Sequence, residues 1–208
     1  MSAFEVQSLF YQGAYKACVE LAASQSTDPS NAATQASLLY AARAHIALGQ
    51  GSQALKLLPA SLASDNIAVG AVRALATFAQ AQANSDARGA DEALSNLTEL
   101  LDEAVVGDPR SEVVRICAAT AMARDGDPIG ALEALDVGTS KAGSSKELES
   151  IALGIHILLS INRTDLAQHE FAAARQWADD SLLIQVSSFL LARHVLDRSA
   201  VIDSMPHS

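Results

Sequence analysis

Apolar residues along the chain recur every three to four positions in eleven segments, which is the period of amphipathic α-helices. β-Branched runs are scarce, and Ala, Leu and Ser dominate, a mixture that favours closely packed helices over sheets. The pattern predicts helices near residues 3–12, 14–24, 33–48, 51–58, 66–83, 89–105, 110–124, 128–136, 146–160, 164–177 and 181–197. They group into five pairs and one unpaired last helix.

A repeat of about 37 residues underlies these pairs. Five segments share a turn, a small residue that marks the inner face of the second helix, and apolar positions at helical spacing; the markers are Cys18, Ala54, Ala93, Ala131 and Ala167. Their intervals are 36, 39, 38 and 36 residues. Gly13, Gly49 and Gly126 each precede a marker by five residues, where glycine permits the left-handed conformation that ends a helix.

This spacing is close to the 34 residues of tetratricopeptide repeats, in which a glycine ends the first helix and an alanine lies where the two helices cross. We therefore predict an all-α fold, a tetratricopeptide-like α-solenoid of about five helix pairs plus one terminal helix. Because such pairs stack on their neighbours, we expect residues 1–208 to form a single array with one continuous core.

The predicted last helix carries apolar residues for which the sequence supplies no covering helix: Leu182, Leu183, Val186, Phe189, Leu190 and Val195. Terminal repeats normally present a polar outer face. We expect this form to be shortened, or a partner to cover its C-terminal face.

The charge balance argues against two classes of partner. The formal charge is −10, from 24 acidic and 14 basic residues, and no basic stripe occurs. Nucleic acid and anionic lipid both require clustered Lys and Arg, so neither is an expected partner. The N-terminus lacks a signal peptide, and the most apolar run, residues 151–161, is too short to cross a bilayer, so we expect a cytoplasmic protein.

No motif specifies a reaction. The stretch from Gly49 to Ala54 matches a dinucleotide fingerprint, but a predicted helix precedes it where the fingerprint needs a strand. The five histidines form no metal-binding pair, and Cys18 and Cys117 read as buried thiols. The carboxylates between Asp91 and Glu103 read as a solvated helix face. We predict no catalytic residue, cofactor, metal or small-molecule substrate, and therefore no enzyme.

The first helices of tetratricopeptide arrays line the concave surface, where partners bind. Alignment on the markers places eight residues there: Arg43, Ile46, Phe78, Gln82, Ile116, Thr120, His156 and Leu159. Their mixed chemistry suits an extended protein surface. A one-residue slip rotates each by about 100°, so some are expected in the core instead.

Four segments, in order and at matching separations, resemble the epsilon subunit of coatomer, the COPI vesicle coat. SLFYQGAYKACVELA (8–22) is similar to the opening helix pair of that family, and LLYAARAHIALGQGSQALKLLPAS (38–61) to the next pair. DGDPIGALEAL (125–135) and LLSINRTDLAQHEF (158–171) resemble later turns. The likeness covers about residues 4–192, and family members continue through further repeats.

The resemblance implies a structural subunit that binds and stabilises the C-terminal domain of the alpha coat subunit during Golgi-to-ER retrograde vesicle transport. It implies a place among the other coatomer subunits, on Golgi membranes and COPI-coated vesicles, with membrane contact only indirect, through the coat. The alternative is a tetratricopeptide adaptor or co-chaperone module that binds a peptide of another protein. Such a module needs a basic clamp, and Arg43, Arg73, Arg115 and Arg124 do not share one repeat position.

Overall fold

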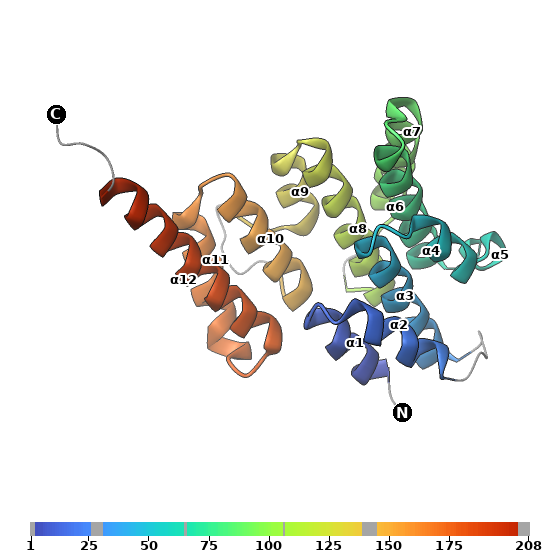
Figure 1. The fold of residues 1–208 in the computed structure, drawn as a ribbon, viewed down its shortest axis with the longest axis horizontal. Coiled ribbons are helices and arrows are strands. Elements are labelled where there is room, and N and C mark those ends of the chain that lie inside the picture. Colours follow the sequence, from blue (N-terminus) through green and yellow to red (C-terminus); the bar gives the residue numbers. More distant parts are fainter. Residues whose placement is uncertain (1–2, 26–30, 65, 106, 139–144, 204–208) are drawn as a thin grey trace. The chain divides into compact units, whose positions relative to one another are not determined.

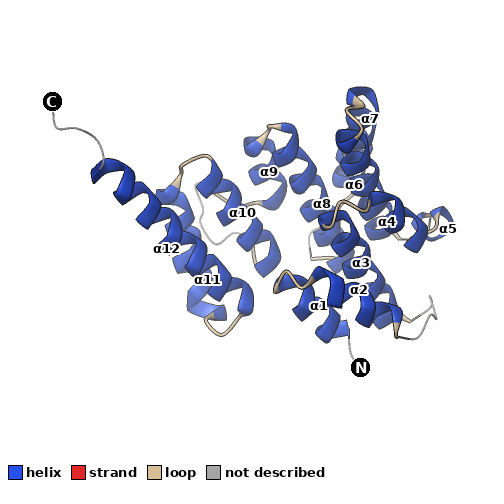
Figure 2. Ribbon diagram, in the orientation of Figure 1, coloured by secondary structure: helices blue, strands red, loops and turns tan. Residues whose placement is uncertain are grey.

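The computed structural model describes residues 3–25, 31–64, 66–105, 107–138 and 145–203, with side chains up to residue 194. Over those ranges the chain forms twelve α-helices and no β-strand (Figures 1 and 2). The prediction of an all-α fold built from helix pairs is therefore confirmed.

Eleven of the helices correspond to the predicted segments, and the five pairs are α1/α2, α3/α4, α6/α7, α8/α9 and α10/α11. The bounds are α1 Ala3–Tyr11, α2 Tyr15–Ala23, α3 Ala32–Ala47, α4 Gly51–Leu57, α5 Ala60–Ala63, α6 Ile67–Ala83, α7 Ala87–Asp102, α8 Pro109–Asp125, α9 Pro128–Leu135, α10 Leu148–Ser160, α11 Thr164–Ala178 and α12 Leu182–Asp203. The sequence did not predict α5, a single turn that follows Pro59. Nor did it predict the last six residues of α12.

The same turn joins the two helices of each pair. One residue in the turn takes the left-handed conformation: Gly13, Gly49, Ser85, Gly126 and Asn162, with φ of 73°, 75°, 56°, 95° and 60°. The N–H of the next residue donates to a carbonyl five positions back, as Ala14 does to Leu9 and Gln50 to His45, at 2.9 and 2.8 Å. This is the Schellman closure of a helix. The role predicted for Gly13, Gly49 and Gly126 is thus confirmed.

The third pair departs from the sequence alignment. In the other four pairs the marker is the fourth residue of the second helix, which in α7 is Ala90 rather than Ala93. Both alanines are buried, at 7% and 5% exposure, so the alignment is wrong by one helical turn while the side chain still packs inward. The cause is Ser85, which takes the left-handed position that glycine occupies in three other pairs.

Packing divides the chain into two compact units, Met1–Ala121 (unit 1) and Met122–Ser208 (unit 2). The larger apolar cluster of unit 1 surrounds α6, whose Phe78 is fully buried and whose alanines admit neighbouring helices. A smaller cluster joins α1, α2 and α3 around Val6 and Cys18. The prediction of one continuous array stays a prediction.

Unit 2 has an aliphatic core. Ile151, Ile155 and Leu158 of α10 are buried, and Val137, after α9, packs so closely on Gly154 that a Cβ there would clash. The Glu170 carboxylate on α11, only 3% exposed, accepts a 2.9 Å hydrogen bond from the Gly138 N–H. One buried carboxylate thus ties the α9–α10 connection to α11.

The last helix, α12, packs on α10 and α11. Ile184 and Leu191 are buried, whereas Val186 is 39% exposed and Phe189 is 67% exposed. Of the residues expected on the uncovered face, Leu182, Leu183 and Leu190 are half-buried, and the Val195 side chain lies outside the described residues.

Candidate partner-binding face

The eight residues predicted to face a partner fall into two groups. Five are buried: Arg43 (9% exposed), Ile46 (8%), Phe78 (0%), Ile116 (5%) and Leu159 (7%). Three are accessible, with Gln82 and Thr120 half-buried and His156 exposed. The structure therefore gives the four apolar residues of the first group a packing role, and binding by any of the eight stays a prediction.

Phe78 and Ile116 illustrate why first-helix residues become core residues here. Each lies on a first helix, α6 or α8, whose buried residues are distributed over more than one face of the helix. Phe78 is the single fully buried aromatic side chain among the described residues. Because its ring fills the core of unit 1, any effect of Phe78 on a partner would be exerted through the position of α6.

Arg43 of α3 occupies the most distinctive environment. Its guanidinium carbon lies 4.7 Å from the centroid of the Phe10 ring and 5.5 Å from that of Tyr40. These are cation–π distances, at which the ring quadrupoles attract the charge and hold the side chain in place. Arg43 is thus an arginine whose position is set by aromatic rings on α1 and α3.

Four half-buried rings surround this arginine, and we call Phe10, Tyr11, Tyr15 and Tyr40 the aromatic cluster. Phe10 lies between Tyr15 and Tyr40, with ring centroids 5.6 and 5.4 Å away, and Tyr11 meets Tyr40 edge-on at 5.8 Å. The cluster contains all three tyrosines of the chain. Offset and edge-to-face rings stabilise one another beyond their buried area.

Hydrogen bonds fix two of the tyrosine hydroxyls of the cluster, those of Tyr11 and Tyr40. The Gln7 side-chain amide donates to the Tyr11 hydroxyl at 3.0 Å and to the Tyr40 hydroxyl at 2.9 Å, and the two hydroxyls lie 3.0 Å apart. Half-exposed tyrosine beside arginine is the composition typical of binding hot spots. The cluster and Arg43 are therefore the best candidate for a partner-binding site in unit 1.

Sequence reasoning identified Arg43 but missed the aromatic cluster. A signal was present, because only 4% of the residues are aromatic and five of them fall within the first 40 positions. Tyr40 also precedes Arg43 by three residues, which places the two on one face of a helix. Helical spacing on α3 could therefore have linked Tyr40 to Arg43, but nothing local indicates that Phe10 packs against both.

Cys18 lies beneath this site and is fully buried. Burial raises the pKa of its thiol, and the nearby charge of Arg43 partly offsets that rise. A buried thiol with a raised pKa is a poor nucleophile, so Cys18 acts in packing.

The accessible predicted residues offer polar contacts but no reactive arrangement. The Thr120 hydroxyl donates to the Ile116 carbonyl at 2.6 Å, within its own helix. The described part of the chain holds no group of three His, Cys, Asp or Glu side chains suited to a metal ion. Among the described residues, no helix has the length and apolar character needed to span a bilayer.

Comparisons with known proteins agree on one family. The model of the coatomer epsilon subunit family matches residues 2–196. Coatomer subunit epsilon-2 of Oryza sativa subsp. indica is 28% identical over 190 residues, which cover 89% of this chain and 58% of the relative. Coatomer subunit epsilon of Caenorhabditis elegans is 29% identical over 189 residues, covering 90% of this chain and 58% of the relative.

The alignment with coatomer subunit epsilon-1 of Arabidopsis thaliana is similar in extent, 24% identical over 185 residues and covering 57% of that protein. The chain thus spans less than two thirds of the length of the curated relatives it matches. Nearly the whole chain nevertheless matches the family model. The chain belongs to the coatomer epsilon subunit family.

Proposed function

We propose that this protein is a non-catalytic structural subunit of the COPI vesicle coat. The observation that carries the proposal is the family match over residues 2–196, together with relatives that are all named as coatomer epsilon subunits. The helix pairs of the chain support a binding role, because stacked helix pairs of this kind commonly present extended binding surfaces.

Within the coat, the proposed partner is the C-terminal domain of the alpha subunit, which this chain binds and stabilises in Golgi-to-ER retrograde transport. The aromatic cluster with Arg43 supports this role, since its side chains combine large apolar area with fixed hydrogen-bonding groups. The accessible Gln82 and Thr120 of unit 1, and separately His156 of unit 2, are further candidates for polar contacts with the partner.

The same proposal places the protein in the cytoplasm, peripheral on Golgi membranes and COPI-coated vesicles. Its contact with the membrane is indirect, through other coatomer subunits. The net charge of −10 supports an indirect contact, because a direct one with anionic lipid would need basic residues.

A titration of the purified chain with the C-terminal domain of the alpha subunit tests the proposal. We expect a one-to-one complex, and we expect Arg43→Ala and His156→Ala each to raise Kd by about tenfold, the loss of roughly 1.4 kcal/mol. Gln53→Ala on the exposed face of α4 is the matched control and should leave Kd unchanged. Circular dichroism of each variant separates lost binding from lost folding.

Stabilisation of the partner needs its own measurement. A ligand that binds only the folded state raises the melting temperature of its partner. We expect the alpha-subunit domain to melt at a higher temperature when the chain is present in excess. A folded chain that neither captures the domain nor raises its melting temperature would contradict the proposed function.

A further inference from the structure

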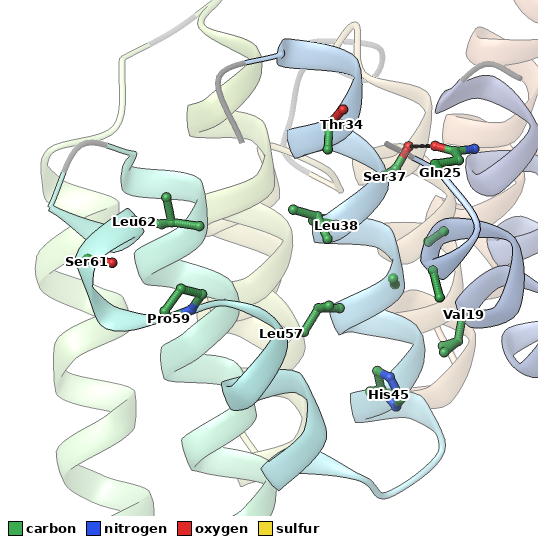
Figure 3. A pocket seen from close by; sticks show the side chains of 13 residues that line it. Val19, Gln25, Thr34, Ser37, Leu38, His45, Leu57, Pro59, Ser61 and Leu62 are labelled. Atoms are coloured by element: carbon green, nitrogen blue, oxygen red, sulfur yellow. Dashed lines mark hydrogen bonds between the residues drawn. The ribbon is translucent and has the colours of Figure 1, made fainter. Parts of the chain in front are cut away.

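Unit 1 contains a cavity of about 530 Å³ between α2, α3 and the α4–α5 segment (Figure 3). Its floor is one stripe of α3, formed by Thr34, Leu38, Ala41 and His45, and Figure 3 shows this stripe between α2 on one side and α4–α5 on the other. The spacing of those residues makes the floor about 16 Å long. The cavity is therefore an elongated groove rather than a compact hole.

The groove exists because one helix of the second pair is short. α3 has 16 residues, whereas its partner α4 has 7 and ends before Pro59. Leu58 is buried in the core, and α5, a single turn that follows Pro59, packs on α6. Half of α3 is left without the second helix that would cover it in a regular pair.

The described residues that line the groove carry no formal charge. None of the thirteen described residues that line it is Asp, Glu, Lys or Arg, although 18% of the chain is charged. The wall also includes His45, whose Nδ1 lies 2.8 Å from Gln50 Oε1. Burying an unpaired charge against such walls costs several kcal/mol or more, so the charge pattern matches an uncharged occupant.

One buried polar atom of the wall, Nε2 of the Gln25 side chain, has no hydrogen-bond partner among the described residues. The neighbouring Ser37 is satisfied, because its hydroxyl bonds to Gln25 Oε1 at 2.9 Å and to the Ala33 carbonyl at 3.0 Å. Buried polar groups normally have a hydrogen-bond partner, so an occupant of the groove is expected to supply one.

We propose that this groove docks a helical segment of a partner protein, one that presents an uncharged apolar face and a single hydrogen-bond acceptor for Nε2 of Gln25. A helix fits because the floor extends for about three helical turns, and an apolar helix face laid in a groove is a recurring mode of recognition. The inference rests on the proposed function, since the partner tested is the alpha-subunit domain.

Filling the groove tests this assignment. Ala41 lies on the floor at 2% exposure and Ala23 lies exposed at the edge, so Ala41→Leu and Ala23→Leu each place apolar atoms where the partner would dock. We expect both variants to bind the alpha-subunit domain at least about tenfold more weakly. Their melting temperatures should not fall, because filling an apolar cavity adds contacts.

Ala17→Leu is the matched control, since Ala17 is exposed on α2 and does not line the groove. It should bind within about twofold of the unmodified chain. Ala23→Leu, at the exposed edge, keeps the test valid if the buried Ala41→Leu variant proves misfolded by circular dichroism.

The outcomes separate the two proposals. If the unmodified chain binds the domain and both groove variants bind equally well, the groove assignment is overturned while the proposed function stands. If the unmodified chain does not bind, both fail. If the neutral dye N-phenyl-1-naphthylamine binds and only its binding is lost in Ala41→Leu, the groove is a small-molecule site and the protein partner is overturned.

Discussion

The two compact units hold their helices together with different chemistry. In unit 1 the junction of α1, α2 and α3 is aromatic and polar, with Arg43 over Phe10 and Tyr40. In unit 2 the junction of α9, α10 and α11 is aliphatic, and its one buried acid, Glu170, holds the Gly138 N–H. Both arrangements fix adjacent helices, but only the first leaves rings and hydroxyls half-exposed.

This contrast distinguishes recognition chemistry from packing chemistry. The Glu170 carboxylate is almost completely enclosed, so it is not available to a partner. The aromatic cluster keeps accessible surface, and the uncharged groove lies beside it on α3. We therefore expect mutations in unit 1 to divide into those that affect folding and those that affect binding, and mutations of the unit 2 junction to affect folding alone.

The largest expected effect is on folding of unit 1. Phe78→Ala removes its single fully buried ring, and such truncations cost about 3–5 kcal/mol. Urea denaturation measures the loss, with Phe4→Ala, at a site 73% exposed, as the control expected to stay within about 0.5 kcal/mol. Amide exchange should quicken most in α6 and its neighbours, because repeat stability is transmitted between adjacent elements. A loss below about 1 kcal/mol would contradict the assigned core.

The positions of helices and turns could be predicted because they depend on local sequence. The spacing of apolar residues located the helix pairs. A glycine in three of the turns predicted the left-handed helix end that the structure shows at Gly49 and Gly126. Ser85 escaped detection because serine rarely takes positive φ. α5 was not predicted because a single helical turn after a proline is too short to show a periodic pattern of apolar residues.

The candidate site could be predicted only in part, because it depends on contacts between distant segments. Sequence spacing placed Arg43 and Phe78 on the same predicted face, yet one lies in an aromatic cluster and the other in the core. A rotation of about 100° per residue separates those environments, and the marker alignment is not accurate to one residue. The groove could not be predicted from the sequence either, because it results from the shortness of α4 relative to α3.

The second-largest expected effect is a loss of folding stability when Glu170, the buried acid of unit 2, is replaced. Glu170→Ala leaves the Gly138 N–H without its acceptor, which costs about 1–3 kcal/mol. Glu170→Gln keeps an oxygen at that position and should cost clearly less. Thermal and urea denaturation of both variants measure the difference, and binding of the alpha-subunit domain should be unchanged at temperatures where both are folded. Equal losses in the two variants would show that the acceptor oxygen is not what stabilises the junction.

The third prediction concerns the stability and binding that depend on Arg43, the charged group at the helix junction of unit 1. Arg43→Met keeps an apolar stem but removes the charge from the Phe10 and Tyr40 rings, at a cost of about 0.5–2 kcal/mol for a partly desolvated cation–π contact. Arg43→Lys retains the charge and should lose less stability. Because the proposed function uses this arginine, Arg43→Met should weaken binding of the alpha-subunit domain by more than its loss of folding stability accounts for. If the loss of binding instead follows the loss of stability, Arg43 is a packing residue like Glu170.

The last prediction compares the turns of the two units, and its Asn162 arm has the smallest expected effect of all. Gly49 in unit 1 and Asn162 in unit 2 take nearly the same left-handed conformation, with φ of 75° and 60°. Gly49→Ala should cost about 1–2 kcal/mol, because a Cβ disfavours that conformation, even though no atom lies within 4 Å of where the Cβ would be. Asn162→Gly should change stability by less than about 0.5 kcal/mol, since asparagine already tolerates positive φ. If Gly49→Ala were neutral by urea denaturation, the shared turn would owe its shape to packing of the flanking helices rather than to the residue within it.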